Sequence, residues 1–500
     1  MIAAAVPAQS MLIRDVELPA RGRGRFDVRI ARGHIETILP AYSNATASAV
    51  VQGRGGLLLP GLCDHHLHLF ATAAARQSVR CGPPTVHDSA QLESALRAVA
   101  RANPGGLRGV GFHESVCGNL DRHWLDRVVP DQPVRIQHRS GMLWILNSCA
   151  LQQLDEASLS PLPAGVETDA NGVLTGRFFD LDAWLGQRLP RSWPALGALS
   201  QQLAAYGVTT VTDAGVRNSA PEWRALDAAA SAGQLLQRVN VMGSEALHVD
   251  LRTTSGMLSR GPLKIYLRES ALPALDALIA QISDAHAAGR CIAVHCVTRV
   301  ELILALAALR EAGVQAGDRI EHGAVMDEDA LALSASLGLC VVTQPHFIAE
   351  RGDRYRKEVA PSDWPHLIRG RSLLAAGVAL AAGSDAPYGD FDPWASMRAA
   401  VERRTGEGVV MSPVECLRAE QALPLYCGTA RDPGAGITPL TAGLVADLCL
   451  LDVGMDELLT DLDARHVALT LRGGNVIYSL PGVIAKTEVA NPSATPVPWS

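Results

Sequence analysis

The two ends of the chain alternate apolar and polar positions over short segments. Residues 10–58 contain MLIRDVEL, FDVRIARGHIETIL and GLLLPG, and residues 436–482 contain ADLCLLDV and VALTLRGGNVIYSL. Alternation with a period of two between glycine-containing turns is typical of β-strands. We therefore expect one small β-rich module assembled from both chain ends. The final segment, NPSATPVPWS, is typical of a surface tail.

The middle of the chain repeats an apolar strand followed by a helix. Seven strand candidates occupy residues 207–215, 235–243, 262–267, 291–297, 319–325, 340–347 and 378–387. Most precede Ala- and Leu-rich segments with helical periodicity, and GLLLPGLCDHHLH supplies an eighth strand. Eight such units predict an α/β fold in which a parallel sheet closes into a (β/α)8 TIM barrel. We assign residues 59–70 and 200–435 to this barrel.

The stretch between the first two barrel strands is too long for the single helix that a barrel needs there. We expect residues 71–199 to form an inserted lobe after barrel strand 1, near the mouth of the active site. The lobe holds four tryptophans: Trp124, Trp144, Trp184 and Trp193. Tryptophan suits a capping or substrate-contacting surface, but it is also a common core residue, and both interpretations stay open.

Composition narrows the class of protein. The formal net charge of -7, with no basic run, argues against a nucleic-acid partner. The sequence holds no uninterrupted apolar stretch of about eighteen residues, so we expect no membrane span. The first residues lack the basic start and sustained apolar core of a secretory signal. Ten cysteines without a CxxC pair predict reduced thiols and a cytoplasmic location.

The strongest local motif is PGLCDHHLH. Its His66 and His68 stand two apart at the end of a strand, so both side chains point to the same face. Neutral imidazoles in this arrangement are good zinc ligands. Asp64 points the same way and could orient a ligand histidine. The pair alone is equally consistent with surface or core histidines.

Three further polar residues close apolar strands before a loop. They are His295 in CIAVH, His322 in RIEH and Asp385 in LAAGSD. In a barrel, polar residues at the C-terminal strand ends indicate an active site, because the site is built there. Each of these residues alone would suit a hydrogen-bonded core role, but the three together with the histidine pair favour one shared metal site.

These motifs in this order resemble the ligand set of the amidohydrolase superfamily. The resemblance includes the lysine of PLKIYL and spans most of the chain, and GLVADLCLLD resembles a strand of the small β-sandwich found in that family. The long insertion and the segments RIEHGAV, TQPHFI and SDAPYGDFDPW are most similar to the amidohydrolase-3 type, the branch like N-substituted formamide deformylase. The resemblance therefore implies that the terminal module is a β-sandwich.

The resemblance also implies roles for individual residues. His66 and His68 would hold the more buried of one or two divalent metal ions, and His295 and His322 the more exposed one. Asp385 would ligate metal and act as the general base.

Two more residues, Lys264 and His346, each have two possible roles. By the same resemblance, Lys264 would be carboxylated on its amine and bridge the metals, because a buried ammonium loses its proton readily. An ordinary ion-paired lysine at the barrel rim is the alternative. His346, at the end of VVTQPH, would bind substrate or stabilise an oxyanion, or be purely structural. Zinc is the default metal, although iron, manganese, nickel or cobalt suit the same ligands.

The predicted function is hydrolysis of a carbon–nitrogen bond in an amide, N-acyl or N-formyl compound through metal-activated water. Deamination of a heterocyclic base on the same barrel is the alternative, but deaminases of that kind carry a glutamate where this chain has Thr298. A metal-free scaffold is the third possibility and would be expected to lack ligands. Arg268–Ser270 and Met142 depart from the branch pattern, which leaves the substrate open. The expected partner is a small molecule, and family habit suggests a homodimer.

Overall fold

The computed structural model describes residues 10–22, 24–83, 85–102, 105–154, 161–189, 193–247 and 252–486. The proposed tail NPSATPVPWS lies outside these ranges. The chain divides into two compact units, one formed by residues 1–69 with 196–500 and the other by residues 70–195. Within the described ranges, no helix combines the length and the apolar character needed to cross a membrane.

The first unit contains a sheet of eight parallel strands, which confirms the predicted (β/α)8 barrel. In chain order the strands are β6 (Leu62–Leu67), β13 (Val208–Asp213), β14 (Arg238–Gly243), β15 (Leu258–Tyr266), β16 (Ile292–Cys296), β17 (Arg319–His322), β18 (Cys340–Thr343) and β19 (Ala379–Ala382). The segment after β19 returns to the first strand, where the Asp385 amide donates to the His66 carbonyl at 2.6 Å. This contact brings the two ends of the sheet together.

Helices alternate with the barrel strands as the periodicity predicted. They are α7 (Gly197–Ala205), α8 (Ala220–Ser231), α9 (Leu275–Ala287), α10 (Arg299–Ala312), α11 (Glu328–Ser336), α12 (His346–Glu358), α13 (Arg371–Ala375) and α14 (Pro393–Glu402). Helix α10 shows why they form, since a Thr298–Glu301 capping box starts it and Leu302, Leu306 and Leu309 give it a buried face. Short helices α15 (Ala419–Ala422) and α16 (Met455–Leu458) follow.

Three of the predicted strands were drawn too long at their C-terminal ends, by three residues or more. The candidates 319–325 and 378–387 end in the structure at His322 and Ala382. His322 has a left-handed backbone, with φ of 69°, and β17 ends at this residue, whereas Asp385, with φ of 50°, lies in the loop after β19. The candidate 340–347 also ends early, at Thr343, because His346 is the first residue of helix α12.

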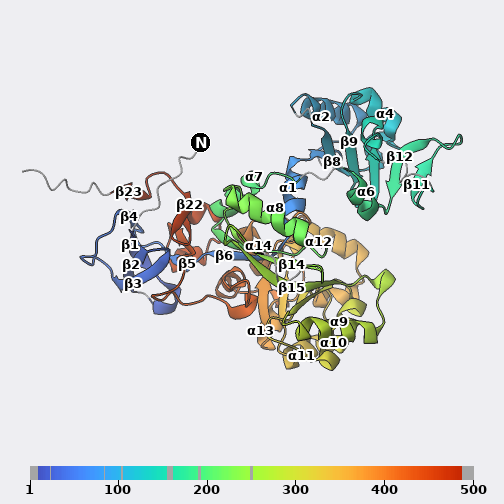
Figure 1. Cartoon of the computed structure of the whole chain (residues 1–500). Coiled ribbons are helices and arrows are strands. Elements are labelled where there is room, and N and C mark those ends of the chain that lie inside the picture. Colours follow the sequence, from blue (N-terminus) through green and yellow to red (C-terminus); the bar gives the residue numbers. More distant parts are fainter. Residues whose placement is uncertain are drawn as a thin grey trace, which may run out of the picture. The chain divides into compact units, whose positions relative to one another are not determined.

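The two chain ends form a β-sandwich, as expected. One sheet has the order β23-β4-β1-β2-β3 and the other β22-β21-β20-β5. The strands are β1 (Ser10–Glu17), β2 (Arg25–Ala31), β3 (His34–Pro40), β4 (Ala49–Gln52), β5 (Leu58–Pro60), β20 (Leu448–Leu451), β21 (Val467–Arg472), β22 (Asn475–Ser479) and β23 (Ile484–Lys486). Ile13, Ile30, Leu450 and Leu469 belong to one buried core shared by the two sheets. Figure 1 shows the blue N-terminal strands beside the red C-terminal ones.

Residues 70–195 form a separate unit with its own sheet, in the order β11-β12-β10-β9-β8-β7. Its strands are β7 (Val79–Arg80), β8 (Leu107–Phe112), β9 (Val134–His138), β10 (Leu143–Leu146), β11 (Val166–Thr168) and β12 (Leu174–Phe179), and its helices are α2 (Ser89–Ala102), α3 (Glu114–Cys117), α4 (Arg122–Val128), α5 (Ser148–Leu151) and α6 (Asp182–Arg188). Helix α1 (Leu69–Gln77) leads into it. This unit is the inserted lobe after barrel strand 1, and its location at the active-site mouth stays a prediction.

The tryptophans of the lobe serve mainly its own packing. Trp124 packs against one buried core, and Trp144 and Trp184 pack against a second. Trp193 is more exposed and lies against Phe70, with ring centroids 4.5 Å apart. These contacts favour the core interpretation for three of the four.

Candidate metal centre

His66, His68 and Asp385 form a compact cluster at the C-terminal ends of β6 and β19. Their ligand atoms all lie within 4.8 Å of one another. Asp385 Oδ1 is 3.4 Å from His66 Nε2 and 3.2 Å from His68 Nε2. His66 and Asp385 are buried, and His68 is partly exposed. Two imidazoles and a carboxylate at these separations can hold one divalent ion.

Two further histidines extend this cluster. The His322 ring, at the end of β17, lies 4.8 Å from the His66 ring between centroids. The His295 ring, at the end of β16, lies 4.5 Å from that of His322. The structure therefore brings together side chains that are widely separated along the chain, at one rim of the barrel.

Lys264 enters the same region from β15. Its side chain is buried, and among the described residues its Nζ has no hydrogen-bond partner. The nearest carboxylate oxygen, Glu321 Oε2, is 4.0 Å away. Burial lowers the pKa of the Lys264 amine. A buried ammonium without a hydrogen bond is costly, so this position suits a neutral amine or a modified one.

Burial also sets the charge of the histidines. It lowers the pKa of His66 to about 3 and that of His295 to about 2, and the charge of nearby Lys264 adds to the effect at His66. The pKa of His322 is lowered too, again mainly through burial. These imidazoles are therefore neutral at physiological pH, which is the form that binds metal.

For Asp385, in contrast to the histidines, neighbouring groups outweigh the effect of burial on the pKa. Burial alone would raise its pKa, but the hydrogen bond from His68 and the neighbouring His66 and His322 outweigh burial and hold the pKa below its ordinary range. The carboxylate is thus ionised at neutral pH. Its left-handed backbone is a conformation that non-glycine residues adopt at a cost, and such residues cluster at functional sites.

The sequence analysis missed two charged residues behind His66. Glu321 is fully buried and its Oε2 is hydrogen-bonded to His66 Nδ1, while Arg319 Nε donates to Glu321 Oε1 at 2.5 Å. Burial opposes ionisation of Glu321, but the charge of Arg319 outweighs it and keeps the pKa well below its usual range. This carboxylate accepts the Nδ1 proton and leaves His66 Nε2 free to bind metal. The visible signal was two charged residues, Arg319 and Glu321, two apart on a fully buried strand.

Gln344 was also missed. Its Oε1 lies 2.7 Å from His322 Nδ1, so it can hold that ring as Glu321 holds His66.

Asp64 was expected to orient a ligand ring, and it acts differently. Its Oδ1 accepts the His66 amide at 3.1 Å and the Ser384 amide at 3.0 Å, which ties β6 to the loop before Asp385. Burial raises the pKa of Asp64 to about 6.

His346 is buried with both ring nitrogens engaged. Its Nε2 lies 3.0 Å from the Ser384 carbonyl and its Nδ1 lies 3.1 Å from Ser396 Oγ. These contacts favour a structural role that holds the loop next to Asp385. The alternative role in substrate or oxyanion binding stays a prediction.

Thr298 occupies the place where a deaminase would carry a glutamate. It caps helix α10, and its Oγ1 accepts the Glu301 amide at 3.3 Å. Glu301 in turn accepts the Thr298 amide at 3.0 Å. The side chain at this position therefore serves the helix.

Comparison with known proteins agrees with this geometry. The amidohydrolase-3 family model, described as amidohydrolase family, matches residues 49–478. The chain is 27% identical over 463 residues to N-substituted formamide deformylase of Arthrobacter pascens, which covers 82% of this chain and 85% of that protein. It is 26% identical over 427 residues to the putative amidohydrolase YtcJ of Bacillus subtilis, covering 74% and 79%. An uncharacterised metal-dependent hydrolase of Pyrococcus horikoshii has the same fold, with a TM-score of 0.74, 19% identity, and coverage of 92% and 99%.

Proposed function

The chain belongs to the amidohydrolase family and is a metal-dependent hydrolase, and from that premise we propose that it cleaves the carbon–nitrogen bond of an N-acyl or N-formyl amine with water. The observation that carries the proposal is the cluster of His66, His68 and Asp385, whose ligand atoms lie within 4.8 Å of one another. The similarity to a formamide deformylase supports the substrate class.

The donor set fits one or two divalent ions, with zinc as the proposed metal. His66 and His68 would hold one ion and His295 and His322 the other, with Asp385 as a further ligand. His66, His295 and His322 are neutral imidazoles and Asp385 is a carboxylate at physiological pH, as zinc binding requires. A bound ion would acidify water and polarise a carbonyl oxygen.

The protein residues supply orientation and proton transfer. Glu321 and Gln344 fix the rings of His66 and His322 from behind. Asp385, ionised and held between two imidazoles, would accept the proton of the attacking water and return it to the leaving amine. The Asp64 and His346 contacts hold the segment that carries this carboxylate.

Lys264 is proposed to be carboxylated. Its neutral amine would add to carbon dioxide, forming a nitrogen–carbon bond and releasing one proton, and the product carries one negative charge. Such a carboxylate could bridge two ions. The buried Nζ, which has no hydrogen-bond partner among the described residues, is the support for this assignment.

A cytoplasmic location and a homodimer complete the proposal. All ten cysteines are free thiols, as expected for a reducing compartment. The homodimer is proposed only because it is a common oligomeric state in this family.

Elemental analysis of the purified protein combined with a panel of N-formyl and N-acyl amines tests the function. We expect one to two equivalents of transition metal and release of formate or a carboxylate. Asp385→Asn should abolish turnover while circular dichroism stays unchanged. Near-normal turnover of that variant, or hydrolysis that survives complete metal removal, would contradict the proposal.

A further inference from the structure

Two arginines lie side by side on the sheet of residues 70–195, and neither belongs to the metal centre. Arg108 on β8 and Arg135 on β9 are register partners in a parallel pair, so their side chains leave the sheet on the same face. Their neighbours Leu107 and Val134 point to the opposite face and lie in the buried core. The arginine stems are thereby fixed by the strand alternation.

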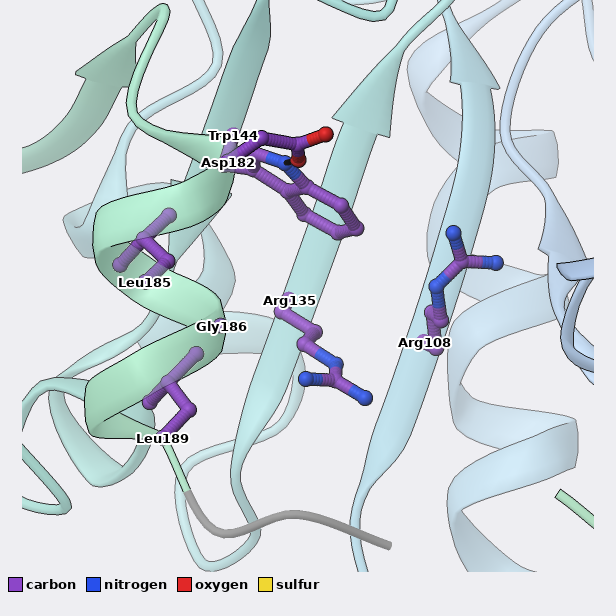
Figure 2. Close-up of a pocket in the computed structure, with 7 residues that line it drawn as sticks. All are labelled: Arg108, Arg135, Trp144, Asp182, Leu185, Gly186 and Leu189. Carbon is purple, nitrogen blue, oxygen red and sulfur yellow. Dashed lines mark hydrogen bonds between the residues drawn. The ribbon is translucent and has the colours of Figure 1, made fainter. Parts of the chain in front are cut away.

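These arginines line a hollow of about 230 Å³. Figure 2 shows Trp144 and Asp182 together at one end and helix α6 along one side, where it presents Leu185 and Leu189. The hollow thus has a cationic wall, an apolar wall and an aromatic end. A larger hollow of about 830 Å³ shares Arg108, Arg135 and Leu189.

Within the hollow the positive charges of the pair are offset only in part: the Asp182 carboxylate favours the charged form of Arg108, and the Arg108 guanidinium lies 5.3 Å from the centroid of the Trp144 ring. Arg108 donates to two neutral acceptors, Ser78 Oγ at 2.8 Å and Gln137 Oε1 at 3.2 Å. The side chain of Arg135 makes no hydrogen bond or ion pair with any residue in the described part of the chain. Asp182, the carboxylate of the hollow, accepts a hydrogen bond from Trp144 Nε1.

Partial burial makes this arrangement costly. It lowers the pKa of Arg108 to about 10, with a further contribution from the charge of Arg135, and it lowers the pKa of Arg135 as well. Two adjacent cations removed from water are stabilised by an anion placed between them. The guanidinium fork matches a planar carboxylate with two parallel hydrogen bonds.

We propose that this hollow binds a small organic carboxylate with an apolar body, held by Arg108 and Arg135 at its charged end and by Leu185, Leu189 and Trp144 along its body. An inorganic phosphate would satisfy the arginines but leave the leucine wall without a partner. The volume is below the roughly 300–1,000 Å³ of sites for drug-sized ligands, which suits a body of about one ring. All seven residues that line the hollow belong to the unit of residues 70–195.

Ligand-detected NMR and calorimetry on the full chain test the proposal, with benzoate as the probe and benzyl alcohol as its uncharged counterpart. Benzoate should bind, and benzyl alcohol should bind at least about tenfold more weakly, because it lacks the charge-assisted hydrogen bonds. Arg135→Met should weaken benzoate binding by a similar factor. Since the Arg135 guanidinium has no partner to lose within the described residues, the melting temperature should stay unchanged. Arg127→Met, at an exposed position of α4, is the matched control and should bind benzoate normally.

The alternative is that benzoate binds at the metal centre. In that case removal of metal would abolish binding and Arg135→Met would leave it intact, which would overturn the proposal. No benzoate binding at all, or equal losses in Arg135→Met and Arg127→Met, would also overturn it. If Arg135→Met folds poorly, Arg135→Lys replaces it, because lysine keeps the positive charge but lacks the two parallel N–H donors of the guanidinium. Arg135→Lys should bind benzoate more weakly than the unaltered chain. Unchanged benzoate affinity in this variant would contradict the proposal.

Discussion

Replacing Glu321 with glutamine should weaken metal binding and destabilise the barrel together. The Glu321 carboxylate is fully buried, accepts Arg319 Nε at 2.5 Å and is hydrogen-bonded to His66 Nδ1. Glutamine keeps the size and one acceptor oxygen, but it removes the negative charge that faces Arg319 and Lys264. The substitution therefore acts on folding through Arg319 and on the metal through His66.

The expected magnitudes follow from these two contacts. Removing one partner of a buried ion pair costs about 3–5 kcal/mol, and because glutamine keeps one hydrogen bond we expect about 3 kcal/mol in the free energy of unfolding. A histidine ligand without its supporting carboxylate loses about 10- to 100-fold in metal affinity. The two effects are measured separately, by denaturant unfolding of the metal-free protein and by competition for metal with a chromophoric chelator.

Glu415 offers a matched control for this substitution. It is also fully buried and accepts Arg369 Nε at 3.0 Å, but it contacts none of the proposed ligands. Glu415→Gln should lower stability and leave metal affinity unchanged. The proposed role of Glu321 in supporting His66 would be contradicted if Glu321→Gln binds metal as tightly as the unaltered protein, or if both variants lose metal affinity equally.

Three further predictions follow from the same region. Lys264→Met should lose at least half of the bound metal and most of the activity. After incubation with carbon-13-labelled bicarbonate, the NMR spectrum of the unaltered protein should show a carbamate signal that is missing from this variant. The same signal in both proteins would exclude the modification of Lys264. Gly383→Ala would place a Cβ 2.4 Å from the His66 amide nitrogen, so we expect a loss of about 1–3 kcal/mol in unfolding experiments, whereas Gly197→Ala, which meets nothing within 4 Å, should change stability little. Burial lowers the pKa of His346 from 6.5 to about 4, so the unfolded chain binds a proton there that the folded one does not. The stability contributed by neutral His346 is therefore present above pH 6.5 and lost as pH falls toward 4, by up to about 3 kcal/mol. His346→Gln should reduce the slope of the free energy of unfolding against pH in this range. An unchanged slope would show that another group causes the pH dependence.

The sequence was sufficient to predict the barrel and the gathering of polar side chains at one of its rims, because both depend on short-range patterns. Apolar strands that end in a polar residue located His295, His322 and Asp385, and parallel strands place such ends at one rim. The left-handed backbones at His322 and Asp385 could not be read from the sequence, since they follow from the packing around each residue. The predicted strand 319–325 was consequently drawn past its end at His322.

The supporting residues were harder to find. Glu321 and Gln344 act on residues that lie on other strands or far along the chain, and their partners are known only when the strands are assembled. The arginine pair of the lobe depends likewise on the register of β8 and β9. Single-residue patterns do not encode such pairings, so one sequence read alone shows only polar or charged residues whose partners are unknown.

The shared sandwich has a consequence for how the chain folds during synthesis. Strand β5 pairs with β20, so the Leu58 edge stays without its partner until residues 448–451 have left the ribosome. The barrel between them can assemble first, because each of its units pairs with a neighbour in sequence. The N-terminal sheet of β4, β1, β2 and β3 must therefore wait with its apolar face exposed for the last part of the chain, the stage at which aggregation or chaperone capture is expected.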